Sequence, residues 1–450
     1  MTNNSLFVII RARKLLFGHV MKHLLALTTA LILTACGGGG SGGPDPVPNA
    51  QIDVVTLGAT YSSVHAPMVL GRFKGDQTQF LVQAHYKFLG NGQTAPVPVK
   101  IYQLNSNGTM IDSTLDILGG ATTLSTNVPL VADFNHDGID DLFFPGFSDT
   151  QDLLPSVAFI SRAGQSHIRV DLPNPVWAHG AVVVDVNNDG HLDVVNNWGE
   201  AWLNNGQGNF TFRAHTYQDV PGMWMHGSGV CAGDFNRTGR SQLVITDQMI
   251  NASIGPIADT VIFEIDGRGL PTAQHYLPVP ILDKNSTTTE LSHDVTCKVA
   301  DLNSDGLPDI LVFSRPWAQG SERWSDRGTV QVLINQGNWQ FVDATDQVIA
   351  NYNTNVLISY TALITDLNGD GRLDLWLGYF DFSSGKANQA FVNNGSGTFS
   401  PVNQSLINSF NASGGMLPVK FNDKWAFVFS TMNSQSGTSL LYLTKPKYTF

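Results

Sequence analysis

The sequence predicts an all-β protein, a seven-bladed β-propeller, from three observations. Short apolar runs alternate with turns along most of the 450 residues, as is typical of strands. A nine-residue acidic loop recurs between pairs of these runs. A second series of turns, rich in Asn-Gly and Asp-Gly, keeps step with the loops and marks further hairpins. One unit therefore contains four strands, which is typical of a propeller blade.

The acidic loop has the pattern D-x-N-x-D-G-x-x-D. Four full copies begin at Asp133, Asp185, Asp301 and Asp366. Degenerate copies near residues 71, 234 and 420 complete a series of seven, at intervals of 49 to 67 residues. Seven units in one continuous domain fit a closed ring.

The loop pattern has the chemistry of a calcium site. Oxygen atoms from positions 1, 3, 5 and 9, with the backbone carbonyl of position 7, are the hard ligands that Ca²⁺ takes. An EF-hand would also need a bidentate Glu at position 12, which is Phe144, Asn196, Val312 or Leu377 here. Metal-free Asx turns are the alternative, but three converging carboxylates repel one another unless a cation is present.

We therefore expect about four structural Ca²⁺ ions. The expected ligands are Asp133, Asn135, Asp137, Ile139 and Asp141; Asp185, Asn187, Asp189, His191 and Asp193; Asp301, Asn303, Asp305, Leu307 and Asp309; and Asp366, Asn368, Asp370, Arg372 and Asp374. In the degenerate copy at Asp234, Thr238 and Gln242 replace two carboxylates. There we expect Arg237 or Arg240 to supply a fixed cation in place of Ca²⁺.

The second turn series defines the outer half of each unit. Its members are Asn105–Gly108, Arg162–Gly164, Asn204–Gly208, Asp266–Gly267, Asn335–Gly337 and Asn393–Gly395. The last unit lacks a clear fourth strand after Tyr442–Thr444, and Ile52–Leu57 is the candidate outer strand for it.

The acidic loop between two strands, with a later strand that ends in N-N-G-x-G-x-F, resembles the FG-GAP/VCBS repeat family. The resemblance covers roughly residues 55–450 and implies the seven-bladed propeller of integrin α heads, with Ca²⁺ in its loops. It carries little information on activity. The copies near 71, 234 and 420 depart from the pattern, which puts a metal there in doubt.

The start of the chain predicts secretion. Lys22 and His23 and the apolar run Leu24–Leu33 follow Met21, the expected true start, so residues 1–35 form a signal peptide outside the fold. Residues 33–36 resemble a bacterial lipobox, which implies lipidation of Cys36. An ordinary cleaved signal peptide is the alternative. Residues 36–50 then form a glycine-rich tether, and the propeller occupies 51–450. We expect a lipid-anchored protein of the cell envelope, on the outer membrane.

Charge excludes some partners. Removing residues 1–35 takes away four basic residues and no acidic ones, which leaves 21 basic against 37 acidic side chains and a net charge near −16. Nucleic acid is therefore not an expected partner, and the membrane is contacted only through the lipid anchor. Cys231 and Cys297 occupy similar places in consecutive units. They form either a disulfide, which secretion permits, or two buried thiols.

Five side chains recur at even offsets before the loops. In the resembled family the loop lies at the bottom of the propeller, so residues that precede the innermost strand lie at the top of the central channel. His65, His179, His226, His293 and Tyr360 lie six or eight residues before a loop, and even offsets preserve side-chain orientation along a strand. In one interpretation, each side chain caps its strand and recurs because the units are repeats of one another. In the other, the side chains converge on a funnel that binds a ligand or a transition metal or transfers protons.

Neighbouring aromatic residues favour a sugar ligand. Trp177 and Trp224 lie two residues before His179 and His226 and would add flat apolar faces. Residues at the end of the second strands would join them at the top: His85, Tyr86, Lys87, Asn197, Trp198, Arg315, Trp317 and Tyr379.

Three functions remain open. The first is a surface module that binds an extracellular glycan or protein at this funnel. The ligand-binding candidates are His65, Trp177, His179, Trp224, His226, His293 and Tyr360. The second is a polysaccharide lyase, because some lyases are similar propellers; its catalytic candidates are His179, His226, His293, Tyr360 and Arg315. The third is a structural component of a surface complex.

Overall fold

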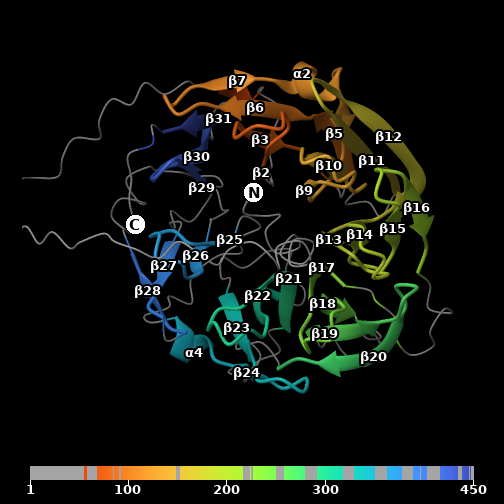
Figure 1. The fold of residues 1–450 in the computed structure, drawn as a ribbon, viewed down its shortest axis with the longest axis vertical. Coiled ribbons are helices and arrows are strands. Elements are labelled where there is room, and N and C mark those ends of the chain that lie inside the picture. Colours follow the sequence, from red (N-terminus) through yellow and green to blue (C-terminus); the bar gives the residue numbers. More distant parts are fainter. Residues whose placement is uncertain are drawn as a thin grey trace, which may run out of the picture.

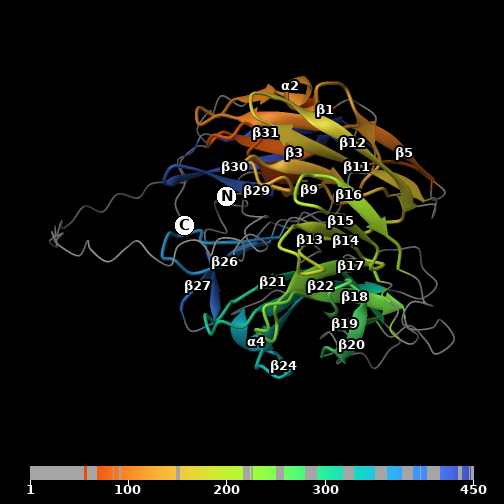
Figure 2. The same ribbon diagram turned by 45° about the vertical axis from the view of Figure 1, so that its right-hand side comes forward.

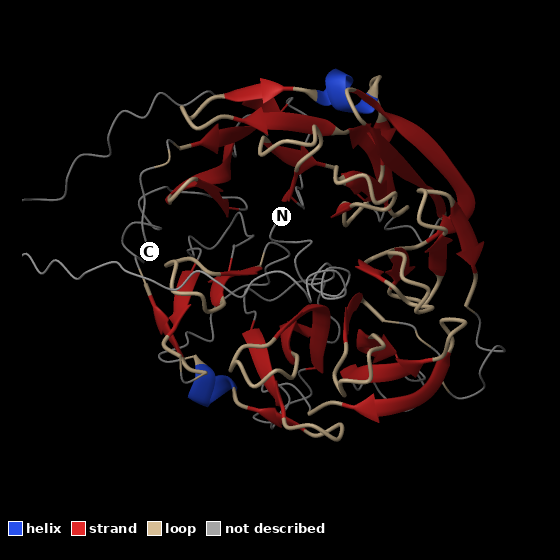
Figure 3. Cartoon of the chain, in the orientation of Figure 1, coloured by secondary structure: helices blue, strands red, loops and turns tan. Residues whose placement is uncertain are grey.

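The computed structural model describes 55–57, 68–84, 86–90, 93–147, 153–215, 223, 225, 227–249, 258–278, 291–317, 329–349, 362–377, 389–395, 397–402, 416–433, 438–444 and 446. The fold is a β-propeller, which confirms the predicted all-β class. Figure 1 shows the sheets arranged around a common centre, and Figure 2 shows the same ring turned by 45°. Two short helices, α2 (Thr114–Leu118) and α4 (Thr345–Val348), lie at the periphery (Figure 3).

The described strands form seven four-stranded sheets and one three-stranded sheet. We name the four-stranded sheets I to VII in chain order. Sheet I is β2 (Met68–Gly71), β3 (Gln79–Gln83), β6 (Lys100–Leu104) and β7 (Met110–Asp112). Sheet II is β9 (Leu130–Ala132), β10 (Asp141–Phe144), β11 (Leu154–Arg162) and β12 (Gln165–Val176). Sheet III is β13 (Ala181–Val184), β14 (Asp193–Asn196), β15 (Ala201–Asn204) and β16 (Phe210–Arg213).

The remaining sheets follow the same order. Sheet IV is β17 (Gly229–Gly233), β18 (Gln242–Met249), β19 (Ala258–Ile265) and β20 (Pro271–Tyr276). Sheet V is β21 (Leu291–Ala300), β22 (Asp309–Trp317), β23 (Thr329–Asn335) and β24 (Phe341–Asp343). Sheet VI is β25 (Leu363–Thr365), β26 (Asp374–Leu377), β27 (Gln389–Asn393) and β28 (Phe399–Pro401).

Sheet VII joins the two ends of the described chain. It is β29 (Met416–Phe421), β30 (Lys424–Asn433), β31 (Thr438–Leu443) and, as its outer strand, β1 (Val55–Leu57). Val55 pairs with Leu441 and Leu57 with Ser439. The predicted contribution of the N-terminal strand to the last unit is therefore confirmed for residues 55–57.

A three-stranded accessory sheet extends sheet I. It consists of β4 (Tyr86–Gly90), β5 (Gln93–Pro98) and β8 (Thr123–Leu124). The β4–β5 hairpin is inserted between β3 and β6, and β5 pairs with β8 ahead of sheet II. All pairs of the named strands are antiparallel, as between β2 and β3 or β21 and β22. The six predicted outer turns each join the third strand of a sheet to its fourth.

The core lies between neighbouring sheets. Because successive side chains of a strand point to opposite faces, each sheet packs against both neighbours. In sheet III, Trp202 packs against Phe143 of sheet II, with ring centroids 5.2 Å apart. Its neighbour Ala201 packs with Phe263 of sheet IV. Trp202, Phe143 and Phe263 are fully buried, and burial of such a side chain contributes about 2–3 kcal/mol.

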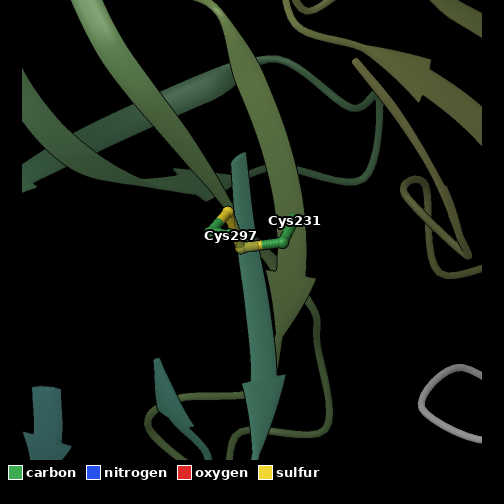
Figure 4. Close-up of a disulfide and its surroundings, with 2 residues drawn as sticks. All are labelled: Cys231 and Cys297. Atoms are coloured by element: carbon green, nitrogen blue, oxygen red, sulfur yellow. A yellow bond between two sulfur atoms is a disulfide. The ribbon is translucent and has the colours of Figure 1, made fainter. Parts of the chain in front are cut away.

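A disulfide joins the first strands of sheets IV and V. Cys231 of β17 and Cys297 of β21 are bonded, with their Cα atoms 5.8 Å apart (Figure 4). The sequence left this pair open between a disulfide and two thiols. A crosslink over 66 residues removes about 4 kcal/mol of chain entropy from the unfolded state by the loop-closure model.

The acidic loops join the first strand to the second in sheets II, III, V and VI, as predicted. We call the end of the ring that carries these loops the loop face and the opposite end the top face. Within the described residues, no helix is long and apolar enough to cross a membrane.

Candidate functional site

The four full acidic loops share one backbone shape. Position 6 is a glycine with φ between 84° and 90°, at Gly138, Gly190, Gly306 and Gly371. Such φ values are accessible mainly to glycine, which explains this part of the motif. Position 4 is also left-handed, but its φ near 60° in three of the loops admits His136, Asn188 and Ser304.

The first aspartate of each loop folds the chain around its own carboxylate. In the loop at Asp185, Oδ1 accepts the N–H of Asp189 at 3.0 Å and Oδ2 accepts the N–H of Gly190 at 3.0 Å. The Asn187 side chain Oδ1 accepts the same Asp189 N–H at 3.0 Å. The loops at Asp133, Asp301 and Asp366 repeat these bonds. The side-chain oxygens of positions 1, 3 and 5 are thereby gathered in one turn.

The ninth aspartate has a different environment, because it is fully buried in all four loops, at Asp141, Asp193, Asp309 and Asp374. In sheet III, Asp193 Oδ2 accepts the N–H of Val186 at 3.1 Å, and Oδ1 accepts the N–H of Asn204 on the third strand at 2.8 Å. The other three loops make the same two bonds. This aspartate therefore ties its loop to the third strand of its own sheet.

A recurrent asparagine extends this link to the previous sheet. Asn204 Nδ2 donates to the carbonyl of Phe134 in the loop of sheet II at 2.9 Å, and to Leu192 in its own loop at 3.1 Å. Asn335 reaches Phe235 of sheet IV, and Asn393 reaches Leu302 of sheet V, in the same way. We call the buried aspartate, this asparagine and the carbonyl it reaches the aspartate clamp.

Other groups on the loop face also bond to a carbonyl of a neighbouring sheet. Trp425 Nε1 of sheet VII donates to the Leu367 carbonyl of sheet VI at 2.7 Å. Gln79 Nε2 of sheet I donates to the Lys420 carbonyl of sheet VII at 2.6 Å. The backbone N–H of Asp140 in sheet II donates to the Arg72 carbonyl of sheet I at 3.0 Å. The loop face therefore also carries hydrogen bonds between sheets VI and VII, VII and I, and I and II.

The loop at Asp234 differs from our expectation. It has the same backbone shape and the same bonds to Asp234. Gln242 Oε1 accepts the N–H of Phe235 at 2.8 Å, as the buried aspartate does elsewhere, while its Nε2 donates to Asn236 Oδ1 and the Arg240 carbonyl. Those two oxygens hold positions 3 and 7 of the motif. The amide hydrogens of Gln242 therefore meet the oxygens that would otherwise face a cation.

The predicted role of an arginine in this loop was wrong for Arg237. Its Nε donates to the Gly306 carbonyl at 3.1 Å and its Nη2 to the Asp305 carbonyl, both in the neighbouring loop of sheet V. The side chain is long enough to leave its own turn, and the carbonyls of the next loop offer a better partner than a turn already filled by Gln242. Arg240 contributes its carbonyl to Gln242.

The full loops fit a hard divalent cation by donor chemistry. Burial raises the pKa of Asp141, Asp193 and Asp309 to about 7, and the carboxylates at positions 1 and 5 raise it further in two of them, Asp193 and Asp309. A carboxylate has about four acceptor positions and these use two, so an ion can still be coordinated. Across the described residues, no group of three or more His, Cys, Asp or Glu is arranged to hold a metal by those side chains alone. The remaining donors of the motif are Asn side chains and backbone carbonyls.

An aromatic cluster lies on the top face between sheets II and III. Trp177 and Trp198 meet edge to face with centroids 5.4 Å apart, and the His179 ring lies 4.4 Å from Trp177. Phe147 lies beneath them, 4.7 Å from His179, and is fully buried. The two tryptophans and His179 are half-buried. We call Trp177, His179 and Trp198 the aromatic platform.

Backbone hydrogen bonds hold the segments that carry the platform. Ala178 N–H donates to Gly146 O at 3.0 Å, and Asn197 N–H donates to Gly180 O at 3.0 Å. Asn127 Nδ2 donates to the His179 carbonyl at 2.7 Å, and Asn197 Nδ2 to the Gly227 carbonyl at 2.6 Å. Five segments from three sheets are therefore fixed relative to one another, so the platform is pre-organised.

The sequence predicted part of this site. Trp177, His179, Asn197 and Trp198 were expected on the top face, and the structure brings them together there. Phe147 and Asn127 were missed, because an isolated phenylalanine after a strand and an asparagine in a turn carry no distinguishing sequence signal.

The other top-face candidates either lie outside the described residues or have only their backbone described. His65, His85, Trp224, His226, Tyr360 and Tyr379 lie outside the described residues. For His293 and Arg315 the structure gives only the backbone, which pairs them directly across β21 and β22. Tyr86 and Lys87 are in β4, and Trp317 ends β22.

Comparison with known proteins supports the repeat. Residues 301–377, which span the loops of sheets V and VI, match the FG-GAP-like repeat. This match confirms the resemblance to FG-GAP repeats. No curated protein matches the chain. Among solved structures, a GH43_1 enzyme from Xanthomonas citri complexed with xylotriose is similar at 9% identity and a TM-score of 0.28, over 87% of this chain and 90% of that one.

The clamp generates a prediction that is independent of metal. Asp193→Asn places an amide N–H₂ among backbone N–H donors, so we expect it to lower the free energy of unfolding by about 2–3 kcal/mol. Urea unfolding in the presence of a chelator measures this. The matched control is Asp189→Asn in the same loop, which is exposed and should cost less than about 0.5 kcal/mol. Equal losses of unfolding free energy in the two variants would show that Asp193 does not act in the aspartate clamp.

Proposed function

We propose that the protein is a calcium-stabilised β-propeller that binds an extracellular carbohydrate on its top face. The observation that carries this proposal is the aromatic platform, in which two half-buried tryptophan rings stand edge to face beside a histidine. A sugar ring has an apolar C–H face and a rim of hydroxyls. It is matched by flat aromatic faces with polar groups beside them.

The fixed position of the platform supports binding rather than simple packing. Bonds from Asn127 and Asn197 order the two segments in the free protein, so little conformational entropy is lost when a ligand binds. Phe147 is fully buried and packs against the rings of Trp177 and His179. A protein ligand is the alternative occupant, since aromatic side chains are also enriched in protein interfaces.

For the scaffold, we propose a closed ring of seven blades, one for each four-stranded sheet. The contacts of β1 with β31 and of Gln79 with Lys420 join the last sheet to the first. Ca²⁺ in the loops at Asp133, Asp185, Asp301 and Asp366 would then neutralise carboxylates that the clamp holds close together. The ion adds stability because it binds only the folded loops.

The calcium proposal predicts a stoichiometry. Binding to the folded state alone, with affinities of roughly 10⁻⁴–10⁻³ M, adds on the order of 1 kcal/mol per site at millimolar Ca²⁺. Chelation should therefore lower the melting temperature. Asp189→Ala should remove one of four ions in equilibrium dialysis, whereas Thr238→Ala in the loop at Asp234 should remove none. A melting curve that EDTA does not change would exclude the calcium sites.

We also propose attachment to the outer membrane through a lipidated Cys36, which rests on the sequence of residues 21–36. Acyl chains would supply the attachment, because lipidation contributes binding energy for each buried methylene. Cys36→Ser should move the protein from the membrane fraction to the soluble fraction after a high-salt wash. Recovery of the variant in the membrane pellet would contradict the anchor.

A polysaccharide lyase is a second candidate, favoured by one observation. The backbone register of β21 and β22 pairs His293 with Arg315. Histidine and arginine are residue types suited to proton abstraction next to a carboxylate. New absorbance near 235 nm with a uronate polymer would identify this activity.

The platform generates the decisive binding prediction. Trp198→Ala should weaken binding of the cognate glycan at least tenfold, because stacking on the indole ring is lost. The melting temperature should change little, since the ring is half-buried. Glycan-array screening followed by calorimetry measures the effect. Trp339→Ala, in the outer turn of sheet V, is the matched control and should bind normally. Retained affinity in the Trp198 variant would place the site elsewhere.

A further inference from the structure

Glu200 is the acidic side chain closest in sequence to the platform. It ends the top-face turn that begins at Asn196 and contains Trp198. Asn196 Oδ1 accepts the N–H groups of both Trp198 and Glu200 at 3.0 Å. Asn196 Nδ2 donates to Glu200 Oε2 at 2.6 Å. One buried asparagine therefore fixes the tryptophan and the glutamate together.

The Glu200 side chain lies on the side of sheet III that faces sheet II, which is also the side of the platform. Trp202 packs toward sheet II and Ala201 toward sheet IV. Side chains alternate along a strand, so Glu200, which precedes Ala201, has the orientation of Trp202. Trp177 belongs to the connection from sheet II to sheet III, on that same side.

One oxygen of the carboxylate is left to solvent. Its Oε1 has no hydrogen-bond partner among the described residues, and no described cation forms an ion pair with it. Burial raises the pKa of Glu200, and the single bond from Asn196 opposes that shift only in part. A half-buried carboxylate with a spare oxygen gains from an added hydroxyl donor.

The nearby arginine does not neutralise this charge. Arg213 pairs with Ala201 across β15 and β16, which places it on the face toward sheet IV. Its Nη2 donates to the Gly199 carbonyl at 3.3 Å and approaches Gly269 of sheet IV. The sheet itself lies between the guanidinium and the Glu200 carboxylate.

We propose that Glu200 accepts a hydroxyl of the bound sugar and thereby restricts the platform to neutral glycans, excluding uronates. This inference rests on the proposed carbohydrate function and names the ligand class of the same site. A neutral sugar supplies a hydroxyl to Oε1, while a uronate brings a second carboxylate next to an unpaired one. Like charges in such a half-buried site repel each other.

The test compares neutral and acidic tetrasaccharides by calorimetry. The probes are cellotetraose, xylotetraose and mannotetraose against tetragalacturonate, with wild type, Glu200→Gln, Glu200→Asp and Trp198→Ala. The wild type should bind one neutral probe at least tenfold more tightly than tetragalacturonate. Glu200→Gln, which removes the charge and keeps an acceptor, should narrow that ratio about tenfold. Glu200→Asp keeps the negative charge on a shorter side chain. It should bind the neutral probe more weakly and should still bind tetragalacturonate poorly.

The controls separate this inference from the proposed function. Glu264→Gln, an acidic residue of sheet IV that pairs with His275, should leave the ratio unchanged. If Trp198→Ala abolishes binding but Glu200→Gln leaves the ratio unchanged, the role of Glu200 is wrong and the platform stands. A wild type that prefers tetragalacturonate also overturns the role of Glu200. If no probe binds, or Trp198→Ala binds normally, the carbohydrate site itself is refuted, and the role of Glu200 with it.

Discussion

The fold depends on a buried carboxylate that accepts two backbone hydrogen bonds. At Asp193 and its three equivalents, one oxygen holds the acidic loop and the other holds the third strand of the same sheet. In sheets III, V and VI the residue that donates from the third strand is an asparagine, and its side chain reaches the loop of the preceding sheet. Burying an ionised group is costly unless its hydrogen bonds are satisfied. The repeated motif therefore fixes the acidic loop within its own sheet and also fixes the contact with the preceding sheet.

The loop at Asp234 shows which part of this arrangement is essential. Gln242 preserves the acceptor that the clamp requires, and its amide hydrogens meet two oxygens that face the centre of the loop. The backbone shape survives without the ninth carboxylate. A repeat can therefore lose this carboxylate and still hold its place in the propeller.

Much of this arrangement was predictable from local pattern, because turns, loops and strand parity are local properties. The even offsets that placed His179 and Trp177 beside Trp198 depend only on strand geometry. The role of Asn204 was not predictable, because its partners lie in another repeat. The error at Arg237 has the same origin: charge composition shows that a cation is present, but not that a long side chain reaches the neighbouring loop. Glu200 was missed because nothing in its sequence context marks its missing partner.

The strand that completes sheet VII gives the ring an unusual mechanical property. Within the described part of the chain, Val55–Leu57 is held to β31 by three residue pairs. Any tension on the chain that precedes Val55 is borne first by these pairs, before it reaches a strand in the interior of a sheet. The strand on which such a force acts is therefore also the strand that completes sheet VII. A force applied to that end of the chain would therefore detach β1 from sheet VII first, while the sheets joined by Cys231 and Cys297 stay crosslinked.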